Sequence, residues 1–365
     1  MSATLFIDGK WRASSDGATW NVLSPADGHL VATVAEATVA DVQDAIAAAR
    51  NAFDNSDFPN LGFDKRSALV AKIADLMERD LKVLAKLESD DTGKRLIEAE
   101  YDIADVIACF RHFEELGKKQ HERVVNVGME HIDSRVVHEA VGVCSLIGPW
   151  NYPLLQISWK IAPALVAGCT MVVKPSELTP STAIYLFKLM EEAGVPKGVV
   201  NLVLGKGANI GDALTGDPRV DLVSFTGGLN TGKRIMGIAA QSVKKVALEL
   251  GGKNPNIIFA DSDLDAAIDN AVTAGFLHSG QVCSAGTRLL VEASVHDQVV
   301  NEIVRRAKAI KLGGPDSPDA ETGPLISESH LNKVQEYVEN GVKEGAKLLV
   351  GGKRIIDGDL AKGNF

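Results

Sequence analysis

A cysteine set among small residues gives this sequence its strongest chemical signal. Cys283 lies in the run Gly-Gln-Val-Cys-Ser-Ala-Gly-Thr-Arg at 280–288. A thiolate is a strong nucleophile, and small flanking residues give it access and backbone freedom. Two further motifs offer partners: Glu249 in Leu-Glu-Leu-Gly-Gly-Lys-Asn-Pro, and Asn151 in Pro-Trp-Asn-Tyr-Pro. A nucleophile, a base and an amide donor together predict chemistry at a carbonyl carbon.

Each of these side chains also has an ordinary structural interpretation. Glu249 fits a surface or paired carboxylate, and Asn151 fits a helix cap or a turn. Cys109, Cys144 and Cys169 stand in apolar helix or strand patterns, so we interpret them as buried, inert thiols. The glycine and serine neighbours favour the reactive interpretation for Cys283 alone.

Three turns have the residues expected where a nucleotide binds at the end of a sheet. Lys174 and Glu177, in Lys-Pro-Ser-Glu, follow a predicted strand and can hold the two ribose hydroxyls. Glu177 would repel a 2′-phosphate, which predicts NAD rather than NADP. The glycines at 227, 228 and 232, like Gly-Lys-Gly at 205–207, open predicted helices whose N–H groups can meet a pyrophosphate. The spacing is not GxGxxG, and an ordinary solvated turn is the alternative for each.

Hydrophobic periodicity predicts an α/β fold that positions these residues. Strands alternating with helices indicate a parallel sheet covered on both faces, with ligands bound at the carboxyl ends of the strands. We expect helices at 38–54, 64–86, 92–120, 154–167, 180–193, 208–215 and 231–241, and strands at 141–147, 170–174, 199–204, 222–225, 244–248 and 256–259.

The pattern restarts after Gly251-Gly252, where we expect a change of domain. Later helices are predicted at 263–275, 295–310 and 328–344, and strands at 289–291 and 346–350. Residues 123–140 have β-branched residues around two turn signals and predict a ribbon-like hairpin. The domains expected are therefore 1–122 with 141–250, the hairpin at 123–140, and 251–365.

Composition excludes several classes of protein. The chain has 365 residues, 45% of them hydrophobic, and a net charge of −10, which argues against a general nucleic-acid binder. No long apolar stretch predicts a membrane span, and the N-terminus has no signal-peptide pattern. The four cysteines form no CxxC pair, so we expect neither a metal site nor a disulfide framework. A protein of the reducing cytoplasm is the natural interpretation.

Taken together, five motifs in register resemble the aldehyde dehydrogenase superfamily over nearly the whole chain. They are Pro-Trp-Asn-Tyr-Pro at 149–153, Lys-Pro-Ser-Glu at 174–177, Phe-Thr-Gly at 225–227, Leu-Glu-Leu-Gly-Gly-Lys at 248–253 and Gly-Gln-Val-Cys at 280–283. The continuation Ser-Ala-Gly-Thr-Arg at 284–288 is most similar to the betaine-aldehyde and aminoaldehyde branch. The resemblance implies a Rossmann-type NAD-binding domain, a second α/β catalytic domain and an oligomerisation hairpin.

The resemblance also implies a mechanism. The Cys283 thiolate attacks the aldehyde carbon to give a thiohemiacetal, while the Asn151 amide and the Cys283 backbone N–H hold the oxyanion. Hydride passes to NAD and leaves a thioester, which water activated by Glu249 releases as a carboxylate. Lys160 is similar to a family lysine assigned to proton relay. A water-activating carboxylate disfavours a CoA-acylating relative.

Further contacts follow from the same resemblance. Tyr152 and Trp159 resemble two walls of an aromatic box for a quaternary ammonium or amine, with helix packing as the alternative. Phe276 would have to stand in for a further aromatic wall. Gly228 replaces a serine common in the superfamily, which leaves its backbone to serve a phosphate. The implied cofactor contacts are Gly148, Pro149, Trp150, Asn151, Lys174, Ser176, Glu177, Gly207, Gly227, Gly228, Gly232 and Leu250.

The end of the sequence departs from the family pattern. Family members continue past this point with a Glu-x-Phe-Gly-Pro motif and a final oligomerisation strand, so we expect an incomplete catalytic domain. The full-length form is expected to be a homodimer or homotetramer. Three alternatives stay open: an NAD-binding fragment without turnover, a thiol esterase, and a dehydrogenase for a different aldehyde.

Overall fold

The computed structural model describes residues 2–120 and 122–365. The chain divides into two compact units. The first unit comprises the chain up to residue 22, residues 32–85 and residues 100–249, and the second comprises 23–31, 86–99 and 250–365. Two short segments of the N-terminal part therefore group with the C-terminal unit.

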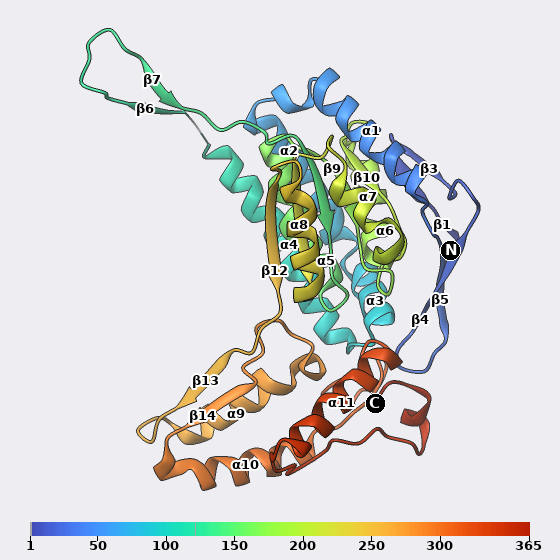
Figure 1. Ribbon diagram of the computed structural model, residues 1–365, viewed down its shortest axis with the longest axis vertical. Helices are drawn as coiled ribbons and strands as arrows, with labels where there is room; N and C mark the ends of the chain where they lie inside the picture. The colour runs from blue at the N-terminus through green and yellow to red at the C-terminus, as the bar shows by residue number, and fades with distance from the viewer. Residues whose placement is uncertain (1, 121) are drawn as a thin grey trace. The chain divides into compact units, whose positions relative to one another are not determined.

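The first unit contains a seven-stranded sheet in the order β12-β11-β8-β9-β10-β2-β3 (Figure 1). β11, β8, β9 and β10 are parallel, with Val143 opposite Thr170 and Cys144 opposite Leu222. β2 and β3 complete the sheet as an antiparallel edge. The strands are β2 (Leu5–Ile7), β3 (Lys10–Arg12), β8 (Val143–Ile147), β9 (Thr170–Lys174), β10 (Val200–Leu202), β11 (Leu222–Gly227) and β12 (Lys245–Leu250).

Helices pack against both faces of this sheet, as the alternating pattern predicts. α1 (Val39–Asn55) packs on β8, β9 and β10, and it contacts α7 (Gly207–Gly216), which contacts α8 (Leu229–Ala240). α5 (Pro153–Ala167) packs on β8 and β9 and contacts α6 (Ser181–Ala193) and α2 (Phe63–Arg79). α5 is apolar nearly all round, which suits a helix enclosed between a sheet and another helix.

Other elements of the N-terminal part complete the fold. β1 (Ser2–Ala3), β5 (Leu30–Ala35) and β4 (Thr19–Leu23) form a three-stranded sheet, in which β1 and β5 are parallel. β6 (Arg123–Val125) and β7 (Ser134–Val136) form an antiparallel hairpin that extends away from the seven-stranded sheet (Figure 1). α3 (Leu81–Thr92) and α4 (Leu96–Lys118) are the remaining long helices, and η1 (Phe58–Asn60) is a single 3₁₀ turn.

The second unit has a small parallel pair of strands, β13 (Pro255–Ile258) and β14 (Arg288–Val291). Its apolar core joins Ile258 of β13 to Ile268, Ala271 and Val299 on two helices. Those helices are α9 (Leu264–Phe276) and α10 (His296–Ala309). The unit also contains α11 (Glu328–Lys343) and the 3₁₀ turns η2 (Leu277–Gly280), η3 (Ala293–Val295) and η4 (Asp359–Lys362).

Some expected elements are wrong in detail. The single helix predicted at 64–86 is two helices, because the chain turns at Asp80, whose N–H bonds back to Leu76 O and Glu78 O. The helix predicted from residue 92 starts at Leu96, since Gly93 has a left-handed φ of +73°. Residues 346–350 are not a strand: Leu348 and Leu349 are exposed, and no described strand pairs with them.

The α/β architecture is as predicted. The sheet is mixed and not purely parallel, because the short N-terminal strands β2 and β3 add an antiparallel edge that the sequence pattern did not predict. None of the helices in the described part of the chain has the length and apolarity needed to cross a bilayer.

Candidate active site

Predicted site residues follow the parallel strands of the first unit at one edge of the sheet. β8 lies between β9 and β11 in parallel register, so the loops after Ile147, Lys174 and Gly227 leave at the same edge. The loop after β8 carries Asn151, and Glu249 lies near the end of β12, the neighbour of β11. The fold therefore gathers residues that are far apart in the sequence.

Lys160 is the most enclosed of the predicted catalytic residues. Its side chain projects from α5 and is 6% exposed, and its Nζ donates to Thr226 Oγ1 at 2.8 Å and Ser224 Oγ at 3.2 Å. Thr226 Oγ1 in turn donates to Gln156 Oε1 at 3.2 Å. A chain of polar groups thus runs from α5 to β11 and back, inside the first unit.

Burial changes the acidity of this lysine. Desolvation lowers the pKa of Lys160 to about 8, and the negative charge of Glu249 opposes that shift. A buried amine with a pKa near neutrality exists in both protonation states at physiological pH. Glu249 itself is exposed on β12. The pair therefore combines a group able to exchange a proton with a carboxylate that water can reach.

The turn between β8 and α5 carries the predicted amide donor and aromatic residues. Asn151 is half-buried and precedes Tyr152, which is the N-cap of α5, so Asn151 is not itself the cap. Trp159 lies on α5, seven residues after Tyr152. Trp159 is 48% exposed, too open for a core packing residue.

The Lys-Pro-Ser-Glu turn has the geometry of a polar clamp. Lys174 ends β9 and is buried, with Nζ donating to Pro175 O at 3.0 Å and lying 3.5 Å from Glu177 Oε2. Burial lowers the pKa of Lys174, and Glu177 opposes the shift. The Glu177 side chain is one-third exposed, and Ser176 Oγ accepts the N–H of Leu178 at 3.2 Å. A carboxylate within reach of solvent is thereby held beside a buried cation.

The glycines of the site differ in what they are needed for. A Cβ at Gly227 would lie 2.5 Å from the Phe225 ring, and one at Gly148 would lie 2.6 Å from Ile157 Cγ1, so packing alone requires both glycines. Gly228 is the N-cap of α8, has open space beside it, and provides no side chain to cap the helix. Gly207 starts α7 in the same uncapped way, and Gly232 is buried within α8.

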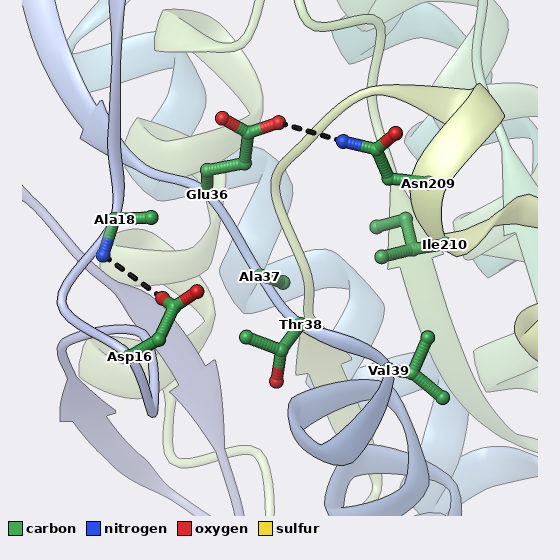
Figure 2. Close-up of a pocket in the computed structure, with 8 residues that line it drawn as sticks. All are labelled: Asp16, Ala18, Glu36, Ala37, Thr38, Val39, Asn209 and Ile210. Carbon is green, nitrogen blue, oxygen red and sulfur yellow. Dashed lines mark hydrogen bonds between the residues drawn. The ribbon is translucent and has the colours of Figure 1, made fainter.

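A side chain of the loop between β5 and α1 forms a hydrogen bond to the start of α7 (Figure 2). Asn209 Nδ2 donates to Glu36 Oε1 at 3.1 Å, as the dashed line in Figure 2 shows. The two side chains border an open hollow of about 350 Å³ that is also lined by Asp16 and Thr38. Because Asn209 is two residues from Gly207, this bond helps to fix the helix start that is predicted to meet a cofactor.

Cys283 belongs to the second unit and is exposed there. It stands in a turn closed by the N–H of Ala285, which donates to Val282 O at 3.1 Å. Before the turn, His278 and Ser279 have left-handed φ angles of 49° and 56°, an uncommon conformation for residues other than glycine. The Ser279 N–H donates to Thr322 Oγ1 at 2.8 Å and supports that conformation.

The other cysteines have different surroundings. Cys144 and Cys169 are buried, and Cys109 is half-buried on α4. Burial raises the pKa of the Cys109 thiol, and that of Cys144 is raised chiefly by its contact with Cys169. Over the described residues, no group of His, Cys, Asp and Glu side chains is arranged to hold a metal ion.

Sequence reasoning missed several residues that shape the site. Ser224 and Thr226 alternate on β11, so their side chains share one face, and this polar alternation in a core strand was a usable signal. Gln281 is buried and its Oε1 accepts the N–H of Ile326 at 2.9 Å. Asn254 bonds to the Cys283 turn. These last two contacts join distant segments, and no local pattern predicts them.

Comparison with known proteins gives consistent matches. Residues 11–365 match the model of the aldehyde dehydrogenase family. The chain is 53% identical over all 365 residues to betaine aldehyde dehydrogenase of Bacillus subtilis, covering 74% of that protein, and 44% identical over 354 residues to human retinal dehydrogenase 2, covering 96% of this chain and 68% of that protein. A crystal structure of Staphylococcus aureus betaine aldehyde dehydrogenase in complex with NAD+ superposes with a TM-score of 0.98 and 46% identity, over 100% of this chain and 73% of that one.

Proposed function

This chain belongs to the aldehyde dehydrogenase family, and from that premise we propose that it oxidises an aldehyde to a carboxylate with NAD. One observation carries the proposal. Of the four cysteines, all within the described residues, only Cys283 is exposed, and it stands in a turn rather than in a core element. An accessible thiol on a loop fits a nucleophile, whereas enclosed thiols fit packing.

The residues at the carboxyl edge of the sheet fit NAD. Glu177 is within reach of solvent beside the buried Lys174, which suits a ribose with free hydroxyls, and the uncapped start of α8 at Gly228 leaves N–H groups for a pyrophosphate. The structure of the Staphylococcus aureus relative was determined with NAD+. When bound, NAD supplies the acceptor for the hydride that leaves the aldehyde carbon.

In the proposed first step, the Cys283 sulfur forms a bond to the aldehyde carbon and the carbonyl oxygen becomes an oxyanion. The Asn151 amide and the Cys283 backbone N–H donate hydrogen bonds to that oxygen, which stabilises charge that develops only as the bond forms. After oxidation, the substrate carbon remains attached to Cys283 as a thioester. Asn151 lies in the loop after β8, immediately before the N-cap of α5.

Glu249 and Lys160 perform the proposed release step. Glu249 removes a proton from water, the hydroxyl oxygen bonds to the thioester carbon, and the carbon–sulfur bond breaks to return the Cys283 thiolate. Lys160, with its pKa lowered to about 8 by burial, exchanges the proton through its contacts with Thr226 and Ser224. The exposed position of Glu249 on β12 gives water access.

Betaine aldehyde or an aminoaldehyde is the substrate we favour. Trp159 on α5 is 48% exposed and Tyr152, the N-cap of the same helix, is half-buried, and an accessible aromatic face attracts a cationic amine. The relative at 53% identity is a betaine aldehyde dehydrogenase. The relative at 44% identity is named for retinal, so a different aldehyde is the alternative.

The test is NADH formation at 340 nm with betaine aldehyde, an aminoaldehyde and a plain aliphatic aldehyde of similar length. We expect NAD-dependent oxidation and a kcat/KM at least about tenfold higher for the cationic substrates, equivalent to about 1.4 kcal/mol. A preference for the aliphatic aldehyde would contradict the substrate assignment. Bound NAD without NADH formation would favour the alternative of an NAD-binding fragment, and ester cleavage without NAD would favour a thiol esterase.

We also propose that the hairpin at 123–140 joins subunits of a homodimer or homotetramer. Val124, Met129 and Ile132 are 69%, 62% and 53% exposed there, and apolar side chains on a projecting hairpin favour burial against a partner. Light scattering after gel filtration tests this, because Val124→Lys should disrupt the interface and so lower the molar mass of the assembly in solution.

The free cysteines favour a reducing, cytoplasmic location.

A further inference from the structure

The turn that carries Cys283 is held from outside by one side chain. Asn254 Nδ2 donates to Cys283 O at 3.0 Å and lies 3.5 Å from Ala285 O. The N–H of Ala285 closes the same turn on Val282 O. Two carbonyl groups of one turn therefore converge on the NH₂ of a single amide, which has two protons to donate.

Asn254 projects from well-anchored backbone. Its own carbonyl accepts the N–H of Arg288 at 3.1 Å, and the next residue, Pro255, pairs with Arg288 at the start of the β13–β14 ladder. Just beyond the turn, the N–H of Gly286 donates to Ala274 O of α9 at 3.1 Å. The amide thus joins an exposed turn to the strand pair that packs on the core of the second unit.

We propose that Asn254 is a positioning residue for Cys283. By fixing the carbonyls of residues 283 and 285, its amide sets the orientation of the turn, and hence the direction in which the Cys283 sulfur and backbone N–H face an aldehyde. Asn254 acts only through the turn and touches no reacting atom. The proposal rests on the proposed function, in which Cys283 is the nucleophile.

Orientation and reactivity of a thiol can be measured separately. Attack on an aldehyde, with the oxyanion held by fixed donors, needs precise alignment, and a displacement of about 1 Å can cost about a hundredfold in rate. Alkylation by iodoacetamide needs only an accessible thiolate. Because Cys283 is already exposed, loosening its turn should slow aldehyde oxidation and leave alkylation nearly unchanged.

Two variants and one control test this. Asn254→Ala removes the amide, and Asn254→Asp keeps its shape but directs a carboxylate at two carbonyl oxygens. The control is Ser262→Ala, which removes another exposed side-chain bond to a backbone carbonyl of the same unit, from Ser262 Oγ to Phe259 O at 2.7 Å. The measurements are kcat and KM for NADH formation, the iodoacetamide alkylation rate of the peptide containing Cys283, and hydrogen exchange over 282–287.

We expect kcat to fall at least about tenfold in Asn254→Ala and further in Asn254→Asp, with KM for NAD and the alkylation rate within about twofold of wild type. Hydrogen exchange over 282–287 should accelerate in both variants, and Ser262→Ala should match wild type throughout. Turnover equal to that of Ser262→Ala would overturn the proposal. So would alkylation that falls in step with turnover, because Asn254 would then act on thiol reactivity or access.

Hydrogen exchange separates this proposal from the proposed function. If the wild-type protein forms no NADH with any aldehyde, the proposed function fails. Faster exchange over 282–287 in Asn254→Ala would then still support the hold on the turn. Unchanged hydrogen exchange over 282–287 in that variant would contradict the proposal that Asn254 fixes the turn, whether or not the protein is an active dehydrogenase.

Discussion

The surroundings of Lys160 and of Cys283 show two ways of holding a reactive side chain. Lys160 lies inside the first unit, on an apolar helix, with hydroxyl groups of an adjacent core strand around its amine. Cys283 lies on an exposed turn of the second unit, whose position depends on hydrogen bonds from distant residues. Packing fixes the first, and a few polar contacts fix the second.

This difference matches the roles that we propose. Burial shifts the pKa of Lys160 toward neutrality. A solvated lysine has no such shift, because water stabilises its charged form. A nucleophile that must admit a substrate needs access instead, and so cannot be fixed by enclosure. Substitution of Lys160 should therefore change the pH dependence of turnover, whereas substitutions at the Cys283 turn should lower the rate of turnover.

Removing the proposed nucleophile should have the largest effect. Cys283→Ala is expected to lower aldehyde oxidation by at least about 10³-fold, because no other exposed thiol replaces it, and to leave the Kd for NAD unchanged. Stopped-flow NADH formation and NAD titration measure the two quantities. Cys109→Ala, which removes a half-buried thiol, serves as the control. Residual turnover near the wild-type rate in Cys283→Ala would exclude Cys283 from the mechanism.

Neutralising the proposed base should separate the two halves of the reaction. Glu249→Gln is expected to lower steady-state turnover about 10²-fold, because general-base catalysis is typically worth that much or more. The first turnover should still release NADH in a burst equal to the enzyme concentration, since only thioester hydrolysis is slowed. Glu336→Gln on α11 is the exposed control. Loss of the burst itself would place Glu249 before the thioester and not after it.

The Lys-Pro-Ser-Glu turn at 174–177 should control the choice between NAD and NADP. Glu177→Ala is expected to reduce the preference for NAD over NADP by about tenfold or more, because a hydrogen bond to a charged group is worth about 1.5–3 kcal/mol and the repulsion of a 2′-phosphate is lost. The ratio of kcat/KM with the two cofactors measures the change. If the ratio does not move, the assignment of Glu177 to the ribose is wrong.

The smallest effect should appear as a change in pH dependence. The pKa of Lys160 lies at about 8, below its ordinary value, so its neutral form increases as pH rises through about 8. We expect the rate of thioester hydrolysis to rise over that interval, and Lys160→Gln to lose this rise while retaining much of the plateau rate. Rate profiles from pH 6.5 to 9.5 test it. Superimposable profiles would mean that Lys160 is not a proton carrier.

The sequence could predict the elements of the sheet better than the contacts between them. Alternating strand and helix patterns located β8, β9, β11 and the helices after them to within a few residues, because buried parallel strands read as short apolar runs. The short edge strands β2 and β3 lack such runs. The bond from Asn254 to Cys283 joins residues 29 positions apart and depends on how β13 pairs with β14, which periodicity does not encode.

The two neighbouring glycines at the start of α8 differ in how cleanly they can be engineered. Any side chain at Gly227 must displace the Phe225 ring, so a variant there would report on folding as well as on the cofactor. A methyl group at Gly228 would enter open space. Gly228 is therefore the position at which a library of small residues can tune affinity for a phosphate while the sheet stays intact.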